Sequence, residues 1–308
     1  MVVDTSDFRK ALKKSLPYYA IAAAGVLFFL LFRYVPMFGI IIAFKDVSPF
    51  SSVQDILTKP FVGIKWFQRF FESYYFWEIL RNTILIRVML IMFGFPIPIL
   101  LALSLNEVLQ RGFKRTIQTI AYIPHFFSTV VVAGLVMMFL SVDGGILNSA
   151  IVLLGGQPHL FLGDPRYFRW ILVVTHIWQH TGWESILYLA AISSIDPELY
   201  ESAVIDGANR MQKIRFITLP SISFIIGLLL IFAVGRLLDA GFELILLLYS
   251  EPVYEVADII DTYVYRSGLL AMQYSFATAV GVFKSVAAMV LLLLCNFVAK
   301  RLGHSGLF

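Results

Sequence analysis

The sequence predicts an all-α integral membrane protein, on two observations. Of the 308 residues, 59% are hydrophobic and 14% are charged, with a mean hydropathy of +0.82; soluble domains are about half apolar and about a quarter charged. The apolar residues also run in stretches of about 20, the length that a helix needs to cross a bilayer. Because no polar stretch is long enough to fold separately, we expect one transmembrane domain over residues 1–308.

Six stretches are apolar enough to be spans, and they cover about 17–34, 78–104, 117–140, 168–192, 220–240 and 276–299. The first should be retained with residue 1, since acidic residues precede it and no small-residue cleavage site follows it. Pro96 and Pro98 interrupt the second, where we expect a kink because the ring removes a backbone donor.

The positions of Lys and Arg predict the orientation. They lie in short clusters beside the apolar stretches, which is typical of topology signals and not of a nucleic-acid groove. With the N-terminus in the cytoplasm, the inside segments hold twelve basic residues and the outside ones seven. We therefore expect both termini to be cytoplasmic.

The outside segment of about 35–77 is rich in aromatic residues. Rings of this kind favour the level of the lipid headgroups, so part of the segment would lie along the membrane surface. Packing of the same rings against the ends of the spans is the alternative.

A charged stretch, ESAVIDGANRMQKIRFITLP, separates the fourth and fifth spans. Asp196-Pro197-Glu198 has the order of a helix start, and a helix would run from Pro197 to Asp206. Gly207 suits the left-handed residue that ends a helix, and Asn209 would cap a second short helix through about Thr218. The product is either a protruding knob or an amphipathic hairpin on the bilayer.

The same stretch carries a spaced motif: Glu201-Ser202-Ala203, three residues, Gly207, nine residues, Ile217-Thr218-Leu219-Pro220. It resembles the coupling-loop signature of binding-protein-dependent ABC importer permeases, with Ser202 where Ala is usual. Shorter stretches resemble permeases for oligosaccharides and polysaccharide fragments, namely Arg33–Gly39, Ile41–Asp46, Phe61–Gly63, Trp66-Phe67, Asn82-Thr83, Tyr122–Pro124 and Gly145–Asn148.

The resemblance implies a type I importer permease with six spans in a bacterial cytoplasmic membrane. Its implied partners are a second related permease, two cytoplasmic ATPase subunits, an extracytoplasmic sugar-binding protein and an oligosaccharide. The loop, about 196–220, would seat in the ATPase through Glu201, Ala203, Asp206, Gly207, Leu219 and Pro220. ATP and Mg would be bound by the ATPase, since this chain has no Gly-Lys dipeptide and so no phosphate-binding loop.

Polar residues inside the fourth span suggest a substrate path. His176, His180 and Glu184 share one helical face, and Trp178, Gln179 and Trp183 lie beside them. Aromatic faces stack on sugar rings, while imidazole and amide groups bind hydroxyls. Helix–helix hydrogen bonding and a zinc site are the alternatives.

In the fifth span, Arg236, Asp239 and Glu243 follow at intervals that place them on one helical face. They would bind a sugar or uronate, or Arg236 and Asp239 would form an internal ion pair. Lys284 in the sixth span would face a carboxylate such as Glu184 or Asp239.

Two other functions fit part of the pattern. An ion-coupled secondary transporter would use the intramembrane acids, although the sequence lacks the internal symmetry expected of one. An intramembrane metalloenzyme would use the two histidines and the glutamate of the fourth span. The residues do not decide between an acidic and a neutral oligosaccharide.

Overall fold

The computed structural model describes residues 5–301, which are helical and contain no β-strand beyond one isolated bridge between Lys45 and Phe61. The predicted retention of residue 1 concerns residues outside this range. Contacts divide the chain into two compact units. The first holds the described residues up to Phe71 and Ser267–Val282, and the second holds Glu72–Arg266 and the residues from Phe283 on.

The first unit begins with one long helical run and continues with two short helices. The run comprises α1 (Thr5–Phe29), the π-helical η1 (Leu30–Tyr34), α2 (Val35–Met37) and the 3₁₀ helix η2 (Phe38–Phe44). The short helices are α3 (Val53–Thr58) and α4 (Lys65–Phe71). The first turns of α17 (Tyr274–Arg301) complete the unit.

A buried lysine organises the segment that joins these helices. Lys45 is 2% exposed, and its Nζ donates to the carbonyls of Ile56 and Leu57 at 2.8 and 2.7 Å. These carbonyls lie at the end of α3, where the helix leaves acceptors unpaired and the helix dipole favours a cation. Trp66 Nε1 donates in turn to the Lys45 carbonyl at 2.9 Å.

The aromatic segment contains both buried and exposed rings. Trp66 and Phe70 are buried and lie 6.5 and 6.4 Å from the Phe276 ring. Tyr74 and Trp77 remain 86% and 73% exposed. Packing therefore accounts for part of the aromatic content, and a surface location remains a prediction for the rest.

The second unit holds most of the helices. Its first half comprises α5 (Phe76–Met89), η3 (Leu90–Gly94), α6 (Pro96–Asn106), α7 (Arg111–Tyr122), η4 (Ile123–Phe126), α8 (Thr129–Leu140), α9 (Ile146–Leu153), η5 (Phe161–Gly163) and α10 (Pro165–Ser193). Its second half comprises α11 (Pro197–Ile205), α12 (Arg210–Lys213), η6 (Ile214–Thr218), α13 (Leu219–Gly235), α14 (Phe242–Leu248), η7 (Glu251–Val253), α15 (Tyr254–Ala257) and α16 (Ile260–Tyr265). The π-helical η8 (Arg266–Leu270) leads into α17.

Three π-helical turns each end two residues before a proline inside a long helix. They are η1 before Pro36, η3 before Pro96 and η6 before Pro220. A proline lacks the backbone donor that would pair with the carbonyl four residues earlier, and its ring crowds that carbonyl. The wider π-turn accommodates the missing hydrogen bond and the crowded carbonyl. Each helix therefore continues past its proline. In the second predicted span, where a kink was expected at Pro96 and Pro98, the irregularity is the π-turn η3.

Four helices are long and apolar enough to cross a membrane: Tyr18–Phe44, Phe76–Asn106, Arg210–Gly235 and Tyr274–Phe297. They correspond to the first, second, fifth and sixth predicted spans. The fifth begins earlier than predicted, because the helix capped by Asn209 runs on through η6 into α13 and is not a separate short helix.

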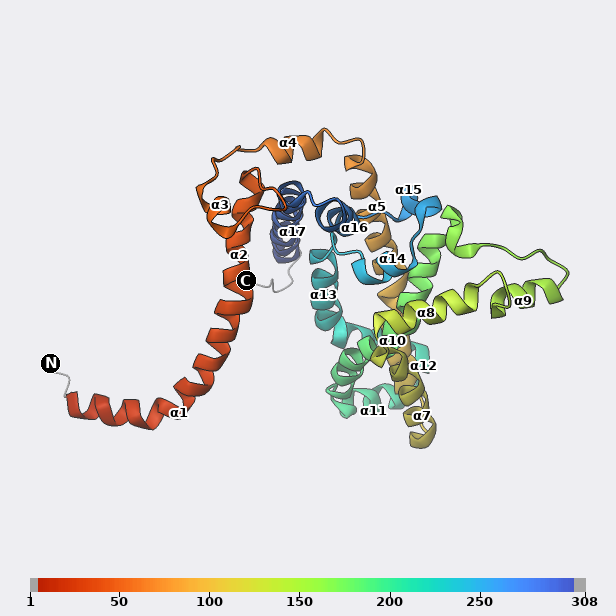
Figure 1. The fold of residues 1–308 in the computed structure, drawn as a ribbon. Coiled ribbons are helices and arrows are strands. Elements are labelled where there is room, and N and C mark those ends of the chain that lie inside the picture. The colour runs from red at the N-terminus through yellow and green to blue at the C-terminus, as the bar shows by residue number, and fades with distance from the viewer. Residues whose placement is uncertain (1–4, 302–308) are drawn as a thin grey trace. The chain divides into compact units, whose positions relative to one another are not determined.

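The third predicted span is wrong as a continuous helix. Residues 111–126 and 129–140 form two helices that meet at 102° (Figure 1). The break follows Pro124, after which Phe127 is extended and Ser128 caps α8 by accepting from the Val131 N–H. If the two helices on either side of the bend together form one crossing, the number of candidate spans among the described residues rises from four to five.

The fourth predicted span is a continuous helix, α10, but it is not among the apolar candidates. Its buried residues follow one stripe and pack on α6, α7, α13 and α15. Near its start, Phe168 and Leu172 belong to an apolar cluster with α5, α8 and α14. Near its end, Tyr188 and Ile192 belong to a second cluster with α6 and α13. The polar segment 176–184 therefore lies along α10 between two apolar cores.

The start of α10 is held by a charged cap. The Asp164 carboxylate accepts from the Arg166 N–H at 2.9 Å and from the Arg166 guanidinium at 2.7 Å. His159 Nε2 lies 2.9 Å from Asp164 Oδ2. Arg166 is the main reason that the pKa of the Asp164 carboxyl is well below its usual range, and the contact with His159 lowers it further. The cap orients the helix that carries the polar segment.

Candidate functional site

The connection between α13 and α14 brings two carboxylates to the site. The helix ends at Gly235, and Gly241 takes the left-handed conformation, at φ 86°, before α14 begins. The prediction that Arg236, Asp239 and Glu243 share one helical face is therefore wrong, because no single helix contains all three. Asp239 lies on the connection, and Glu243 lies in the first turn of α14.

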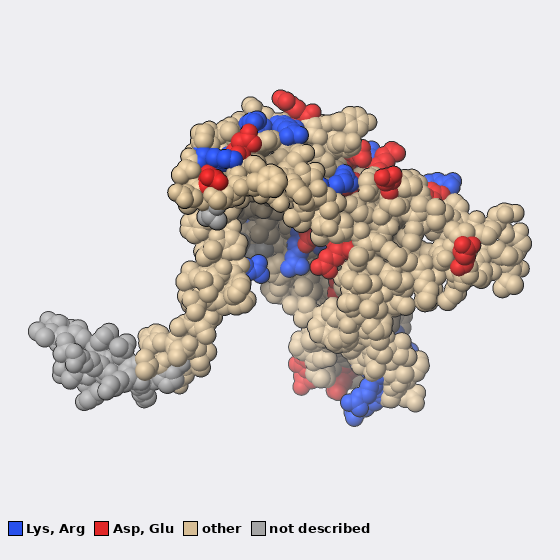
Figure 2. Space-filling model, viewed as in Figure 1, with Lys and Arg blue, Asp and Glu red and all other residues tan. Residues whose placement is uncertain are grey.

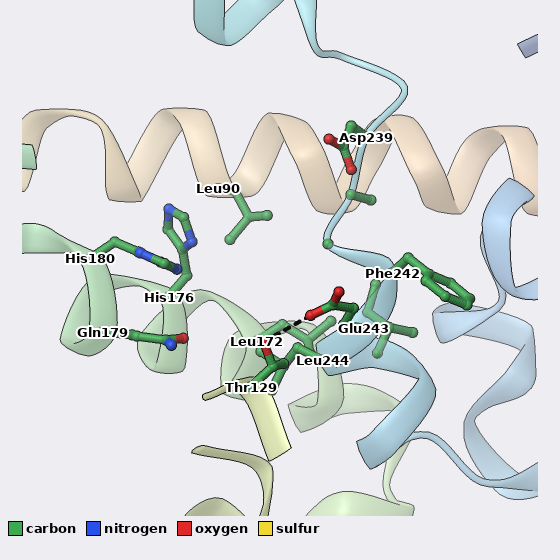
Figure 3. Close-up of a pocket in the computed structure, with 13 residues that line it drawn as sticks. Leu90, Thr129, Leu172, His176, Gln179, His180, Asp239, Phe242, Glu243 and Leu244 are labelled. Atoms are coloured by element: carbon green, nitrogen blue, oxygen red, sulfur yellow. Dashed lines mark hydrogen bonds between the residues drawn. The ribbon is translucent and has the colours of Figure 1, made fainter. Parts of the chain in front are cut away.

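These carboxylates face the polar segment of α10 across a pocket of about 370 Å³. Figure 3 shows His176, Gln179 and His180 projecting from one wall, with Asp239 and Glu243 on the other. Leu90, Leu172 and residues 240–245 complete the lining, together with Thr129 at the start of α8. A pocket with apolar walls and a few convergent polar groups is typical of a small-molecule site.

Two hydrogen bonds connect the start of α8 to both walls of the pocket. Thr129 Oγ1 donates to Glu243 Oε2 at 3.0 Å, the dashed line in Figure 3. Gln179 Nε2 donates to the Phe127 carbonyl at 3.3 Å. The bend between α7 and α8 thus brings Phe127 and Thr129 to the pocket, and no hydropathy pattern predicted them there. The Ser128-Thr129 pair, a helix-start signal four residues after Pro124, is the local signal that was available.

The carboxylates of Asp239 and Glu243 have no ion-pair partner within 4 Å among residues 5–301. The predicted alternative of an internal Arg236–Asp239 ion pair is therefore wrong. Lys284 was predicted to face Glu184 or Asp239, but its Nζ lies 2.6 Å from the Asp261 carboxylate. Neither carboxylate is paired with a cation, so both retain acceptor capacity for a ligand, although Glu243 already accepts from Thr129.

A row of contacting imidazole and indole rings extends from the pocket towards the helix bend. The rings of His176 and His180 are 4.6 Å apart, and His125 lies 5.5 Å from His180. His125 stacks on Trp183 at 4.5 Å with an interplanar angle of 4°. His125 was not among the residues predicted for the path, because it lies in η4, in another part of the chain.

The other predicted path residues lie elsewhere. Trp178 lines a separate apolar hollow of about 510 Å³ between α8 and α10, while Glu184 and Arg236 do not line the pocket. Among the described residues, no group of three or more His, Cys, Asp or Glu is arranged to hold a metal ion. The pocket thus unites five of the ten residues predicted for the path, and their contact with substrate remains a prediction.

The segment between α10 and α13, predicted as a protruding knob or a hairpin on the bilayer and called the knob below, has the caps and the turn predicted for it. Asp196 caps α11 by accepting from the Glu198 N–H at 3.0 Å, with Pro197 in the first turn. Gly207 has φ 76°, the left-handed region that glycine enters freely. Asn209 and Gln212 form a reciprocal capping box at 2.7 and 2.9 Å. The predicted caps at Asp196 and Asn209 and the left-handed Gly207 are therefore confirmed.

The knob exposes most of the motif residues. Glu201, Asp206 and Gly207 are exposed and Ala203 is half-buried, while Leu219 packs beside the cluster that contains Tyr188 and Ile192. Charged side chains gather at the end of the unit where α7, α11 and α12 lie (Figures 1 and 2). The knob is thus a polar, accessible element at the end of the second unit where α7, α11 and α12 lie (Figure 1).

A family model for the inner membrane component of binding-protein-dependent transport systems matches residues 94–304. The chain belongs to this family. It is 44% identical to the Bacillus subtilis (strain 168) polygalacturonan/rhamnogalacturonan transport system permease protein YteP, over 99% of this chain and 97% of that protein. The match covers nearly the whole of both proteins.

Solved structures agree with this assignment. A chain of a bacterial ABC transporter involved in the import of the acidic polysaccharide alginate is 42% identical with a TM-score of 0.87, covering 96% of this chain and 99% of that one. A second structure, in complex with an alginate pentasaccharide-bound periplasmic protein, is 43% identical with a TM-score of 0.87, covering 97% and 99%. The predicted carbohydrate-import permease of the ABC type is therefore confirmed, as is a multi-pass, all-α membrane protein.

Proposed function

We propose that this chain is one permease half of an ATP-driven importer that carries oligosaccharides from acidic polysaccharides into the cytoplasm. The exposed, glycine-broken knob at the foot of the bundle is the observation that carries the proposal. Its residues have the order and spacing of the family's coupling loop, and it has the accessibility that docking on another subunit requires. The ion-coupled alternative has no comparable support.

The complete transporter would need several further subunits. We assign ATP and Mg binding to two cytoplasmic ATPase subunits, because this chain has no phosphate-binding loop. A second, related permease would complete the pathway, and an extracytoplasmic sugar-binding protein would deliver the oligosaccharide. The relative solved with a periplasmic protein supports that last partner.

We retain six crossings within one permease domain of the bacterial cytoplasmic membrane, with both termini and the knob in the cytoplasm. In this arrangement α10 is a crossing whose polar segment is shielded by α6, α7 and α13, and α7 with α8 forms a broken crossing. Polar groups inside a membrane face a bundle interior or an aqueous cavity. Irregular backbone, as at Phe127, is tolerated where protein surrounds it.

The pocket beside α10 is the proposed part of the substrate path. The carboxylates of Asp239 and Glu243, which have no cation partner, accept hydrogen bonds from sugar hydroxyls, and the Gln179 amide and the imidazoles offer donors and acceptors. Two carboxylates repel a uronate carboxylate at this position, so the hydroxyl edge of the sugar would face them. The relatives that import alginate or polygalacturonan support an acidic substrate.

Reconstituted transport tests the proposal. The complex of this chain with its permease partner, ATPase and binding protein would be placed in liposomes and given alginate pentasaccharide, trigalacturonate or maltopentaose. We expect ATP-dependent uptake of one of the acidic sugars to exceed uptake of maltopentaose. Uptake that follows an ion gradient without ATP would overturn the importer assignment, and a preference for maltopentaose would overturn the acidic substrate.

Substitutions in the pocket test the path. Asp239→Asn and Glu243→Gln retain size but weaken the acceptors, and we expect each to lower uptake about tenfold, since hydrogen bonds to charged groups contribute about 1.5–3 kcal/mol. Glu251→Gln removes an exposed carboxylate outside the pocket and serves as the control. Equal uptake by all three variants would remove the pocket from the path.

A further inference from the structure

Few interactions hold α11 to the rest of the second unit. None of its residues is buried, and its capping bonds are local to Asp196 and Glu198. The exception is Tyr200, which is half-buried and whose hydroxyl lies 2.9 Å from Thr218 Oγ1. Within residues 5–301 this is the only side-chain hydrogen bond that joins α11 to another helix.

The partner of Tyr200 is buried and has a second bond of its own. Thr218 is 1% exposed, and its Oγ1 lies 3.4 Å from the Lys213 carbonyl one π-turn earlier. A hydroxyl has one proton to donate. When the Thr218 hydroxyl donates to that carbonyl, the Tyr200 hydroxyl is left to donate to Thr218. The pair therefore forms a directed chain from the knob to the backbone of the long helix.

This chain reaches the helix at its least regular point. Thr218 is the last residue of the π-turn η6, and Pro220 follows two residues later. Such turns interrupt the regular hydrogen-bond ladder and are frequent at functional sites. Directly beyond the turn, Leu219 and Ile222 pack in the apolar cluster with α6 and α10. A displacement of α11 would therefore act on the helix Arg210–Gly235 at its π-turn, where the hydrogen-bond ladder is interrupted. This point lies directly before the residues that pack in the apolar cluster.

We propose that the Tyr200–Thr218 hydrogen bond is the link through which movement of the α11 knob is transmitted to the helix Arg210–Gly235. The two residues are positioning residues: they touch neither substrate nor nucleotide, and they hold the knob in register with the π-turn. This inference rests on the proposed function, because it needs the knob to be moved by an ATPase.

The two hydroxyls can be removed with little change of volume. Tyr200→Phe and Thr218→Val each break the bond, whereas Thr218→Ser retains a hydroxyl. In the complete transporter in liposomes with alginate pentasaccharide and trigalacturonate, we measure uptake, ATP hydrolysis and the amount of ATPase that co-purifies. We expect uptake per ATP to fall about fivefold in each breaking variant, the factor that one hydrogen bond contributes, with ATPase binding unchanged.

The double variant and the conservative variant separate this role from general damage. Because both single changes break one bond, the double variant should lose no more than either alone, and Thr218→Ser should regain most of the coupling. Thr119→Val is the matched control, since that exposed hydroxyl donates to the Arg115 carbonyl of its own helix at 2.9 Å. It should leave uptake per ATP unchanged.

Three results overturn the inference: full coupling in Tyr200→Phe, additive losses in the double variant, or a loss of ATPase binding equal to the loss of uptake. The failure of the proposed function would look different. In that case the wild-type complex itself would show no ATP-dependent uptake of either sugar.

Discussion

Gly207 offers the sharpest test of the coupling role proposed for the knob. The residue has φ 76°, and a Cβ added to it would meet no atom within 4 Å. A substitution there is therefore penalised by backbone conformation alone and not by collision. Gly155 is an exposed residue with φ 82° and the same open surroundings in the connection after α9. The two glycines differ in location and not in the local cost of replacing them.

The expected cost is about 1–2 kcal/mol for either glycine, because an L-residue in the left-handed region is less stable by that amount. Such a cost lowers the population of the native turn by a factor of about 5 to 30. Valine is the replacement of choice, since β-branched residues are especially disfavoured at positive φ. Gly207→Val should thus reorient α11 against the helix that begins at Arg210.

The assay compares the two variants in the complete transporter. Gly207→Val should reduce uptake per ATP hydrolysed, or the amount of bound ATPase, at least about fivefold, which follows from the lower limit of that cost. Gly155→Val should leave both quantities within about twofold of the wild type while lowering thermal stability to a similar extent. An equal transport defect in the two variants, or none in Gly207→Val, would refute the knob as the coupling element and favour an amphipathic hairpin on the bilayer.

Two further predictions concern α10. Since contacts with Arg166 lower the pKa of Asp164, its contribution to stability is present above the ordinary carboxyl pKa of about 4 and is lost as the pH falls towards the lower folded value. Thermal unfolding of Asp164→Asn should therefore depend less on pH below about 4 than that of the wild type, and parallel profiles would contradict this assignment. A Cβ on Gly182 would collide with the Ala121 carbonyl, so Gly182→Ala should lower the free energy of unfolding by about 1–3 kcal/mol. Gly134→Ala, in a helix with open space around the Cβ, is the control, and equal destabilisation by both would contradict the close approach.

Local features of the fold could be predicted from neighbouring residues. The start of α11 at Asp196-Pro197, the left-handed Gly207 and the cap at Asn209 each depend on groups a few positions apart. The same holds for the family motif, whose spacing is visible without coordinates. Hydropathy likewise located four of the six predicted spans as long apolar helices.

The third and fifth spans show where a hydropathy pattern misleads. Residues 117–140 are mostly apolar, yet the helix breaks after Pro124. The apolar run of the fifth span reaches about residue 240, but α13 ends at Gly235 and Gly241 redirects the chain. Hydropathy measures how well a residue tolerates an apolar environment and carries no information on backbone direction.

The sequence by itself determined that this protein is an apolar helical permease with a charged, glycine-broken loop, because composition, capping and motif spacing act over short distances along the chain. Only the tertiary structure decided which polar groups meet. It placed Asp239 and Glu243 opposite His176 and Gln179, and it paired Lys284 with Asp261. These groups are far apart in sequence, and their proximity depends on how the helices pack and where they break, which no local pattern encodes.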